Sequence, residues 1–336
     1  MRKLASVMLF LLLLVLILLV WPLFREEPQN VRVRSDTFLT VFGNCWENMD
    51  SHGTIEGILE NFMTENPRIA VLYEGMKGNE YYNVLAARSR SGRLDDVFFV
   101  NHDYAVSLTR EGRLADLSGL NRTEGFRPSV MRYMCKTDGK LHWVPLTITV
   151  FGLYVNVGLR EANGLDIPTT LTGWETICRF FADKGVLPVV ANRDISLKAM
   201  FVGRALHGLY EEHRERDVLR SVSLGRTGLG DLLMPGLELA EKFIRNGWID
   251  AQAALRTQRA SDDLTAFARG QSPFMLTGAW AADRLKKLGP GFSFAVTPYP
   301  IRDDGWVLVG NLDMRLAAAA GGRHAKEAEK IPELAC

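Results

Sequence analysis

The fold is decided by the run Phe38-Leu39-Thr40-Val41-Phe42, which is apolar at four of its five positions. A short apolar run containing aromatic and β-branched residues predicts a buried strand. Apolar residues then recur at helical spacing over residues 55–63, and a second apolar run follows at residues 69–73. A helix over residues 80–90 and a third strand over residues 96–100 complete a β-α-β-α-β order. This order predicts an α/β fold with a doubly wound, largely parallel sheet.

The same alternation starts again further along the chain, which predicts a second α/β unit. Strands are expected at residues 150–155, 186–190, 273–277 and 292–298, and helices at 173–183, 196–210, 236–246 and from about 279. Two such units in tandem indicate two lobes. Ligands of such sheets bind at the carboxyl ends of the strands, where the loops of both lobes face each other.

Composition excludes several classes of protein. The net charge of +1 gives no electrostatic reason to expect a nucleic-acid partner. The four cysteines are scattered without metal-ligand spacing, so neither a metal site nor a cofactor is expected. Cys178 shares a helical face with Trp174, Ile177 and Phe181, which predicts a buried thiol.

The N-terminus predicts export. Arg2 and Lys3 precede residues 4–24, a run of 21 residues without a charge, which as a helix would be about 31 Å long. Basic residues stay on the cytoplasmic side, so the rest of the chain is expected outside. We expect residues 1–35 to be an uncleaved anchor in the cytoplasmic membrane. The alternative is a signal peptide cut at an unusual site, which would release the protein to the periplasm or medium.

Three stretches of the chain carry recognisable motifs. The first includes Asn61-Phe62-Met63-Thr64-Glu65-Asn66-Pro67 and Gly112-Arg113-Leu114-Ala115-Asp116-Leu117, the second Asp138-Gly139-Lys140-Leu141-His142-Trp143-Val144-Pro145-Leu146 and Gly152-Leu153-Tyr154-Val155-Asn156, and the third Phe267-Ala268-Arg269-Gly270 and Phe274-Met275-Leu276-Thr277-Gly278-Ala279-Trp280. Together they resemble family 1 extracellular solute-binding proteins, the sugar-binding, maltose-binding-protein-like components of ABC importers. Their order and spacing extend over residues 36–330.

The resemblance implies a type II periplasmic-binding-protein fold, a clamshell of two lobes. Lobe one would hold residues 36–147 and 298–336, and lobe two would hold residues 148–297. Extended crossings at 145–149 and 297–300 would be the hinges. Members of the family usually continue further, so we expect a truncated chain that lacks the C-terminal part of lobe two. A compact natural variant is the alternative.

The resemblance and the strand ends together indicate the ligand-binding residues. Trp280 follows a strand-to-helix turn, at a family position where an aromatic ring stacks on sugar; the alternative is a core tryptophan at a helix start. Asp103, with Asn101 and His102 before it, follows the strand at 96–100. For Asp103 the alternative is a helix N-cap.

Further candidates lie at other strand ends and in the expected hinge, each with an ordinary structural alternative. They are Trp46, Glu47 and Asn48 after the first strand, Thr147 and Thr149 in the hinge, Asn192, Asp194 and Lys198 after residues 186–190, and Asn311 and Asp313 after residues 307–310. A solvated loop, β propensity or a turn would explain them equally well.

The expected function is reversible binding of a sugar or oligosaccharide and its delivery to the transmembrane subunits of an ABC permease. One alternative is a membrane-tethered sensor that reports ligand occupancy to a signalling partner. Another is an extracellular carbohydrate-active enzyme, but the adjacent acidic pairs resemble caps and turns, and no nucleophile or zinc motif is present. No catalytic residue is therefore expected.

Overall fold

The computed structural model describes residues 35–45, 51–121, 123–135, 137–192, 196–256 and 262–333. The strands are β1 Thr37–Cys45, β2 Ile69–Lys77, β3 Val97–Val100, β4 Val144–Asn156, β5 Val189–Val190, β6 Phe274–Gly278, β7 Phe294–Thr297 and β8 Val309–Ala318. The helices are α2 Ser51–Glu65, α3 Gly78–Arg90, α4 His102–Arg110, α5 Pro128–Met134, α6 Val157–Ala162, α7 Leu171–Ala182, α8 Ser196–Glu211, α9 Glu215–Ser223, α10 Leu229–Arg245, α11 Ala251–Arg256, α12 Asp262–Ala268, α13 Ala281–Leu288, α14 Ala325–Ala328 and α15 Lys330–Glu333. A short 3₁₀ turn covers Thr123–Gly125.

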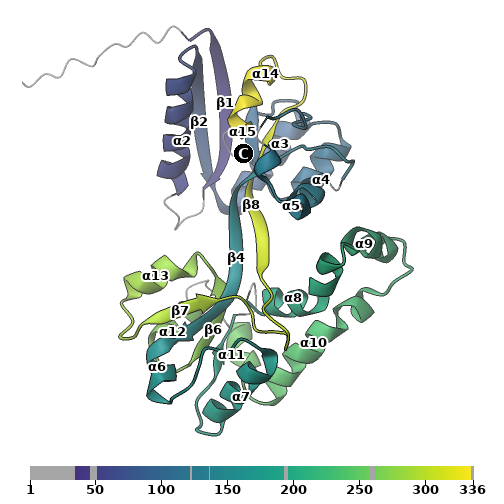
Figure 1. Cartoon of the computed structure of the whole chain (residues 1–336). Helices are drawn as coiled ribbons and strands as arrows, with labels where there is room; N and C mark the ends of the chain where they lie inside the picture. Colours follow the sequence, from purple (N-terminus) through teal and green to yellow (C-terminus); the bar gives the residue numbers. More distant parts are fainter. Residues whose placement is uncertain are drawn as a thin grey trace, which may run out of the picture.

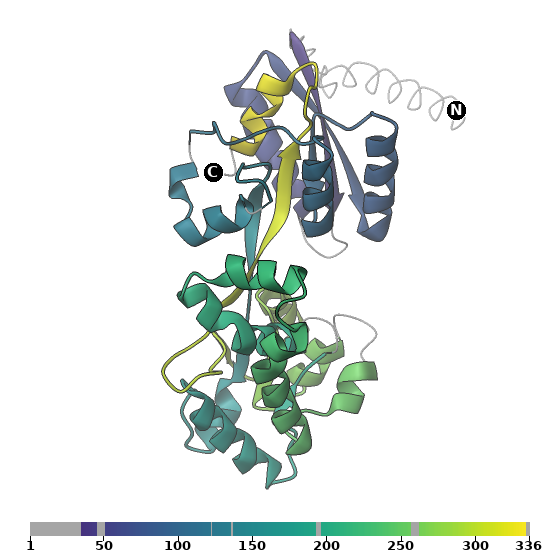
Figure 2. The same cartoon turned by 90° about the vertical axis from the view of Figure 1, so that its right-hand side faces the viewer.

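Two bodies are joined by the long strands β4 and β8 (Figure 1). Lobe one contains β1–β3 with α2–α5, α14 and α15, and lobe two contains β5–β7 with α6–α13. The two bodies remain separate in the view turned by 90°, with the strands passing between them (Figure 2). Within the described ranges, no helix has the length and hydrophobicity that a bilayer crossing needs.

Lobe one confirms the expected β-α-β-α-β order. β1 pairs in parallel with β2 on one side and with β3 on the other. All four residues of β3 are buried, as expected for a strand covered on both faces. The core of this lobe also contains Leu312 and Leu316 of β8, so the chain returns to lobe one after building lobe two.

A single sheet extends through both lobes, in the order β2-β1-β3-β8-β4-β6-β5, with β7 paired to β4. β8 is antiparallel both to β3 and to β4. In lobe two, β4 runs antiparallel to β6 and to β7, and only β5 and β6 are parallel. The expectation of a largely parallel sheet therefore holds for β1–β3 but not for lobe two, because β6 returns beside β4 in the opposite direction.

Lobe two buries both faces of its sheet. Leu153 and Val155 pack with α7, α8 and α10 on one face, whereas Tyr154 packs with α12 and α13 on the other. Helix α7 contributes Trp174 and Cys178 to the first of these cores, which confirms the predicted buried thiol. Burial raises the pKa of that thiol well above its usual range.

Two expectations about the return crossing are wrong. Tyr299, Ile301 and Val307 pack in the core of lobe two, so this stretch does not belong to lobe one and residues 297–300 are not a hinge. The return crossing lies instead in β8, whose residues 309–313 pair with residues 147–151 of β4. The polar pair Asn311 and Asp313 lies inside this strand rather than in a turn, because β8 can leave polar side chains unburied where it passes between the lobes.

Candidate ligand-binding site between the lobes

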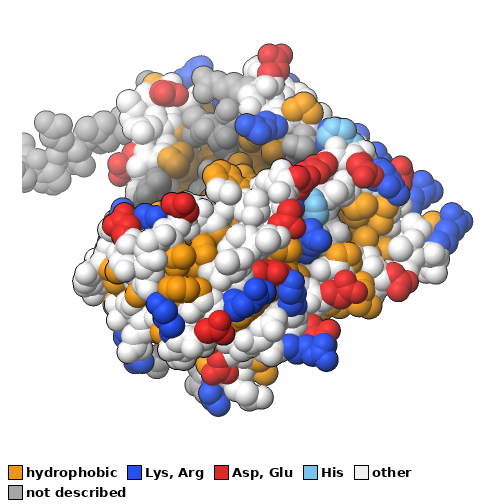
Figure 3. All heavy atoms as spheres, turned by 60° about the horizontal axis from the view of Figure 1, so that its bottom comes forward, with side chains coloured by type: hydrophobic (Ala, Val, Ile, Leu, Met, Phe, Trp, Pro, Cys, Tyr) orange, Lys and Arg blue, Asp and Glu red, His pale blue; other side chains and the backbone are white. Residues whose placement is uncertain are grey.

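The carboxyl ends of the strands in the two lobes point toward each other. β3 is antiparallel to β8, β8 to β4, and β4 to β6, so β3 and β6 run in opposite directions. The chain leaves β3 at Val100 on the side facing lobe two, and it leaves β6 at Gly278 on the side facing lobe one. The space-filling view shows a recess between the lobes in which hydrophobic side chains are visible (Figure 3).

Lobe one presents a polar and aromatic wall. The rings of Tyr82 in α3 and Tyr104 in α4 stack with centroids 5.4 Å apart, and the Tyr104 hydroxyl donates to the Tyr82 carbonyl at 3.2 Å. Asn44, near the end of β1, donates from Nδ2 to the Tyr82 phenol oxygen at 3.3 Å. Its Oδ1 is buried and has no hydrogen-bond partner among the described residues. Because the Tyr82 oxygen accepts from Asn44, the phenol proton remains available to a ligand oxygen.

The electrostatics keep the Tyr82 phenol protonated. Burial raises its pKa, and the nearby Asp313 carboxylate adds to this, while the hydrogen bond from Asn44 and the charge of Arg315 act in the opposite direction. This coupling also shows that Asp313 and Arg315 of β8 lie near Tyr82. The wall of lobe one therefore continues onto the crossing strands.

The crossing strands carry their polar side chains on one face. Thr147 lies opposite Asp313, and Thr149 lies opposite Asn311, so the four side chains share a face of the antiparallel pair. Thr149 donates from Oγ1 to Asp313 Oδ2 at 3.3 Å. Arg315 donates from Nη2 to Asn311 Oδ1 at 3.2 Å. Thr147 and Asn311 are exposed, and Thr149 and Asp313 are half-buried.

Lobe two contributes an aromatic pair. Trp280, which immediately precedes α13, meets Phe151 of β4 edge-on, with centroids 5.4 Å apart and an interplanar angle of 86°. Gly278 pairs with Phe151, and a Cβ on Gly278 would lie 1.7 Å from the Trp280 ring. The ring therefore covers the face of the sheet that Phe151 also faces. Trp280 is half-buried, so part of its ring remains accessible.

These contacts connect both lobes into one candidate site, which we call the inter-lobe site. Its members are Asn44, Tyr82, Tyr104, Thr149, Phe151, Trp280, Asn311, Asp313 and Arg315. Flat aromatic rings and planar polar groups are the two kinds of partner that a sugar needs, for its C–H faces and its hydroxyls.

The polar residues after β3 have different roles from one another. Asn101 is the N-cap of α4, since its Oδ1 accepts from the Tyr104 N–H at 2.9 Å. Asp103 is therefore not the cap. The His102 ring lies 6.3 Å from the Tyr133 ring, which in turn meets the ring of Trp143 edge-on.

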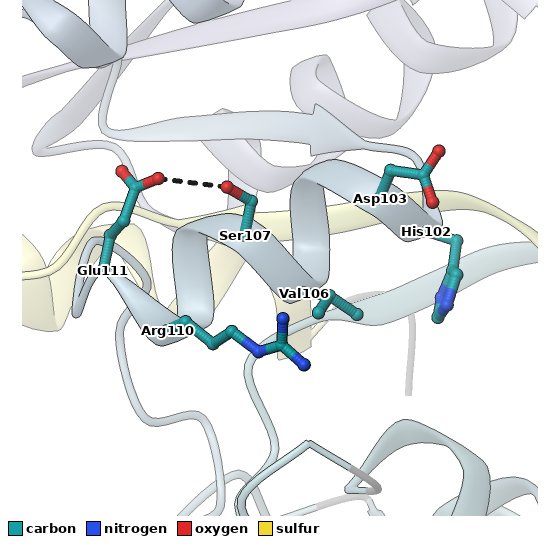
Figure 4. Close-up of a pocket in the computed structure, with 6 residues that line it drawn as sticks. All are labelled: His102, Asp103, Val106, Ser107, Arg110 and Glu111. Atoms are coloured by element: carbon teal, nitrogen blue, oxygen red, sulfur yellow. Dashed lines mark hydrogen bonds between the residues drawn. The ribbon is translucent and has the colours of Figure 1, made fainter. Parts of the chain in front are cut away.

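Asp103 is exposed in the first turn of α4. It lines an open hollow of about 420 Å³ with His102, Val106, Ser107, Arg110 and Glu111 (Figure 4). All six residues come from this one helix and its end, and Ser107 donates to Glu111 at 3.0 Å. A hollow on a single helix offers no opposing wall, so it lacks the enclosure of a ligand site.

Some of the other candidate residues lie within the described residues, and some do not. Trp46, Glu47, Asn48 and Asp194 lie outside the described residues, as do residues 1–34 of the anchor expected at residues 1–35. Asn192 donates to Asp263 in α12 at 2.7 Å, which ties it to the core of lobe two. Lys198 is exposed in the first turn of α8. In the part of the chain that the structure describes, no group of three His, Cys, Asp or Glu residues could hold a metal ion.

Sequence reasoning missed five members of the site: Asn44, Tyr82, Tyr104, Phe151 and Arg315. Asn44 follows the strand at 38–42 and could have been found by the strand-end argument. Tyr82 and Tyr104 lie within helices, where helical spacing does not separate a core ring from a ring at a surface. Arg315 is the one cation between Leu312 and Ala320, and a charge in an apolar strand was a usable signal.

Comparison with known proteins identifies the class. Residues 57–331 match the family described as bacterial extracellular solute-binding protein. The chain belongs to this family, and its place is on the extracellular side, as the sequence predicted. The class is that of two-lobed solute receptors.

Individual relatives agree with this assignment. The multiple sugar-binding protein of Streptococcus mutans is 24% identical over 315 residues, which cover 89% of this chain and 71% of the relative. The apo form of RafE from Streptococcus pneumoniae superimposes with a TM-score of 0.71 at 22% identity, covering 90% of this chain and 76% of RafE. A family 1 extracellular solute-binding protein from Bifidobacterium longum subsp. infantis gives a TM-score of 0.73 at 19% identity, covering 90% and 77%.

Proposed function

We propose that the protein binds a sugar or oligosaccharide reversibly at the inter-lobe site and delivers it to the transmembrane subunits of an ABC permease. The observation that carries this proposal is the pairing of an aromatic wall with a polar wall from two different lobes. Trp280 and Phe151 would cover a C–H face of the sugar, while Asp313, Asn311 and the Tyr82 phenol would bind its hydroxyls.

Related proteins support a carbohydrate ligand. One relative is named a multiple sugar-binding protein, RafE has been solved with raffinose, and a Bacillus licheniformis sugar transporter has been solved with stachyose. We propose that the two lobes close on the ligand about β4 and β8, and that residues 1–35 anchor the receptor near its permease. Thr147 is exposed beside Asp313 and would contact the ligand on closure.

A thermal-shift screen of the full-length chain tests the proposal. The panel contains mono-, di-, tri- and tetrasaccharides including raffinose and stachyose, with polyols, amino acids and peptides as the competing ligand classes. Ligand that binds only the native state raises the melting temperature, so at least one carbohydrate should raise it. A cooperatively unfolding sample that no carbohydrate stabilises would contradict the proposal.

Two tryptophan variants provide a matched comparison. Trp280→Ala should weaken binding of the carbohydrate by about 1–3 kcal/mol, the range for one aromatic ring stacked on a flat ligand, taken by analogy. Trp306, which is 49% exposed and outside the inter-lobe site, is the control. Trp306→Ala should leave the affinity unchanged. An equal loss of affinity in both variants would show that Trp280 is not part of the site.

A further inference from the structure

Arg315 is a buried cation at the edge of the inter-lobe site. It pairs with Val100, the last residue of β3, on one side and with Pro145 of β4 on the other. Only 5% of the residue is exposed. Its Nη2 reaches Asn311, an exposed residue further along β8 toward lobe two, so the guanidinium extends toward the space between the lobes.

The guanidinium of Arg315 is poorly compensated. It carries five N–H donors, and the bond to Asn311 at 3.2 Å is the one hydrogen bond it makes among the described residues. Its Nε is buried without a partner, and it forms no ion pair with a described residue. The Trp143 ring lies 5.0 Å away and offers a weak cation–π contact. Burying a charge without a partner costs free energy of folding. The buried guanidinium of Arg315 therefore indicates that a further group supplies its missing ionic partner.

Groups of both signs lie near Arg315, but no described carboxylate is paired with it. Helix α4 begins at His102, two residues after Val100, and a helix N-terminus carries a partial positive charge. The nearest carboxylate on β8, Asp313, is already bound by the Thr149 hydroxyl and by the Met314 N–H at 3.0 Å. Asp103 is exposed in the first turn of α4. Neither carboxylate is paired with Arg315.

We infer that the preferred ligand is an acidic carbohydrate, whose uronate carboxylate pairs with Arg315. This inference rests on the proposed function and adds the chemical class of the sugar. A planar guanidinium matches a carboxylate through two parallel hydrogen bonds, and the carboxylate also neutralises the buried charge. A hydroxyl can fill one donor of Arg315 but leaves its charge uncompensated.

The test compares an acidic trisaccharide with its neutral counterpart. Trigalacturonate and the same trisaccharide after reduction of its carboxyl groups are titrated into the full-length chain by calorimetry. The wild-type protein should bind the acidic form at least 10-fold more tightly. Raising the salt concentration should weaken binding of the acidic form more than binding of the neutral form, because ion pairs are screened.

Three variants separate charge from structure. Arg315→Gln should lose the preference for the acidic form and retain affinity for the neutral form within about threefold, whereas Arg315→Lys should keep part of the preference. Arg110→Gln, at an exposed residue in the last turn of α4, should bind both forms like the wild type. Melting curves show whether each variant folds. If Arg315→Gln does not fold, Arg315→Lys still tests the inference.

Three outcomes overturn the inference. If the neutral trisaccharide binds as tightly as the acidic one, or more tightly, the inference fails while the proposed function stands. If no acidic or neutral carbohydrate binds a folded sample, both fail together. A preference for the acidic form that Arg315→Gln leaves intact would place the carboxylate on another residue and would also overturn it.

Discussion

Substituting Gly278 by Ala should disable the aromatic wall of lobe two without touching Trp280 itself. A Cβ at position 278 would lie 1.7 Å from one Trp280 ring atom and 2.2 Å from two others. Non-bonded carbon atoms prefer separations of about 3.5–4.0 Å, so the ring must move by roughly 1.5–2 Å or rotate away. The backbone at position 278 cannot move away from the ring, because Gly278 is paired in β6 opposite Phe151.

Gly278→Ala should weaken ligand binding more than it lowers the free energy of unfolding. Displacing one stacking ring should cost about 1–3 kcal/mol of binding free energy, or roughly 5- to 150-fold in Kd. Overpacking in a closed core costs about 1–3 kcal/mol of unfolding free energy. The loss of stability should fall at the low end of that range, because Trp280 is half-buried and its ring can turn outward.

Calorimetry with the carbohydrate found by thermal shift, and urea denaturation of the same samples, measure the two effects. Gly208→Ala is the matched control, because a Cβ at position 208 in α8 has no neighbour within 4 Å. It should leave affinity unchanged and stabilise the protein by roughly 0.5–1 kcal/mol. The reasoning is refuted if Gly278→Ala binds like the wild type. It is also refuted if the losses from Gly278→Ala and Trp280→Ala add fully in the double variant.

Three further predictions concern caps, a contact between the lobes and a buried acid. Asn101→Ala should lower the free energy of unfolding by about 0.5–2 kcal/mol in urea, while Asp103→Ala changes it by less than about 0.5 kcal/mol, because Asn101 is the cap of α4. Arg132 of α5 in lobe one lies 2.9 Å from Nδ1 of His213 in lobe two, and since a guanidinium only donates, this bond needs an unprotonated Nδ1. Removing this contact in His213→Ala should lengthen the distance between spin labels on the two lobes, and an unchanged distance would contradict this. Burial raises the pKa of Asp263 above its unfolded value, so its charged form costs stability at neutral pH and this cost disappears as the pH falls through the folded pKa. The stabilisation that Asp263→Asn brings at pH 8 should therefore shrink as the pH falls through the folded pKa, and a gain that stays constant down to pH 3 would be inconsistent with the shift.

Local patterns predicted the elements of lobe one well. The apolar runs at 38–42, 69–73 and 96–100 became β1, β2 and β3, because short apolar runs favour strands that are buried on at least one face. β3 is buried at all four positions, whereas Phe38 of β1 and Leu72 of β2 are exposed. The same rule failed at Asn311 and Asp313. There a strand leaves the core and passes between the lobes, so its polar residues looked like a turn.

The sequence could not predict which residues come together in the site. Thr149 and Asp313 meet only because β4 and β8 pair, and their spacing in the sequence carries no signal of that pairing. Tyr81 and Tyr82 show that the sequence also does not distinguish a core tyrosine from a site tyrosine within one helix. Tyr81 is fully buried and bonds the carbonyls of Phe42 and Phe99, whereas its neighbour Tyr82 faces the inter-lobe site.

The central position of β8 in the sheet of lobe one sets the order in which the protein can be completed. During synthesis, residues 35–144 emerge first and supply β1, β2 and β3, but the exposed edge of β3 stays unpaired until residues 315–318 arrive. Such pairings between distant parts of a chain form slowly, and an unpaired edge invites contact with other chains. A stop codon anywhere before β8 should therefore leave the first-made half of the protein prone to aggregation, although every residue of that half would be intact.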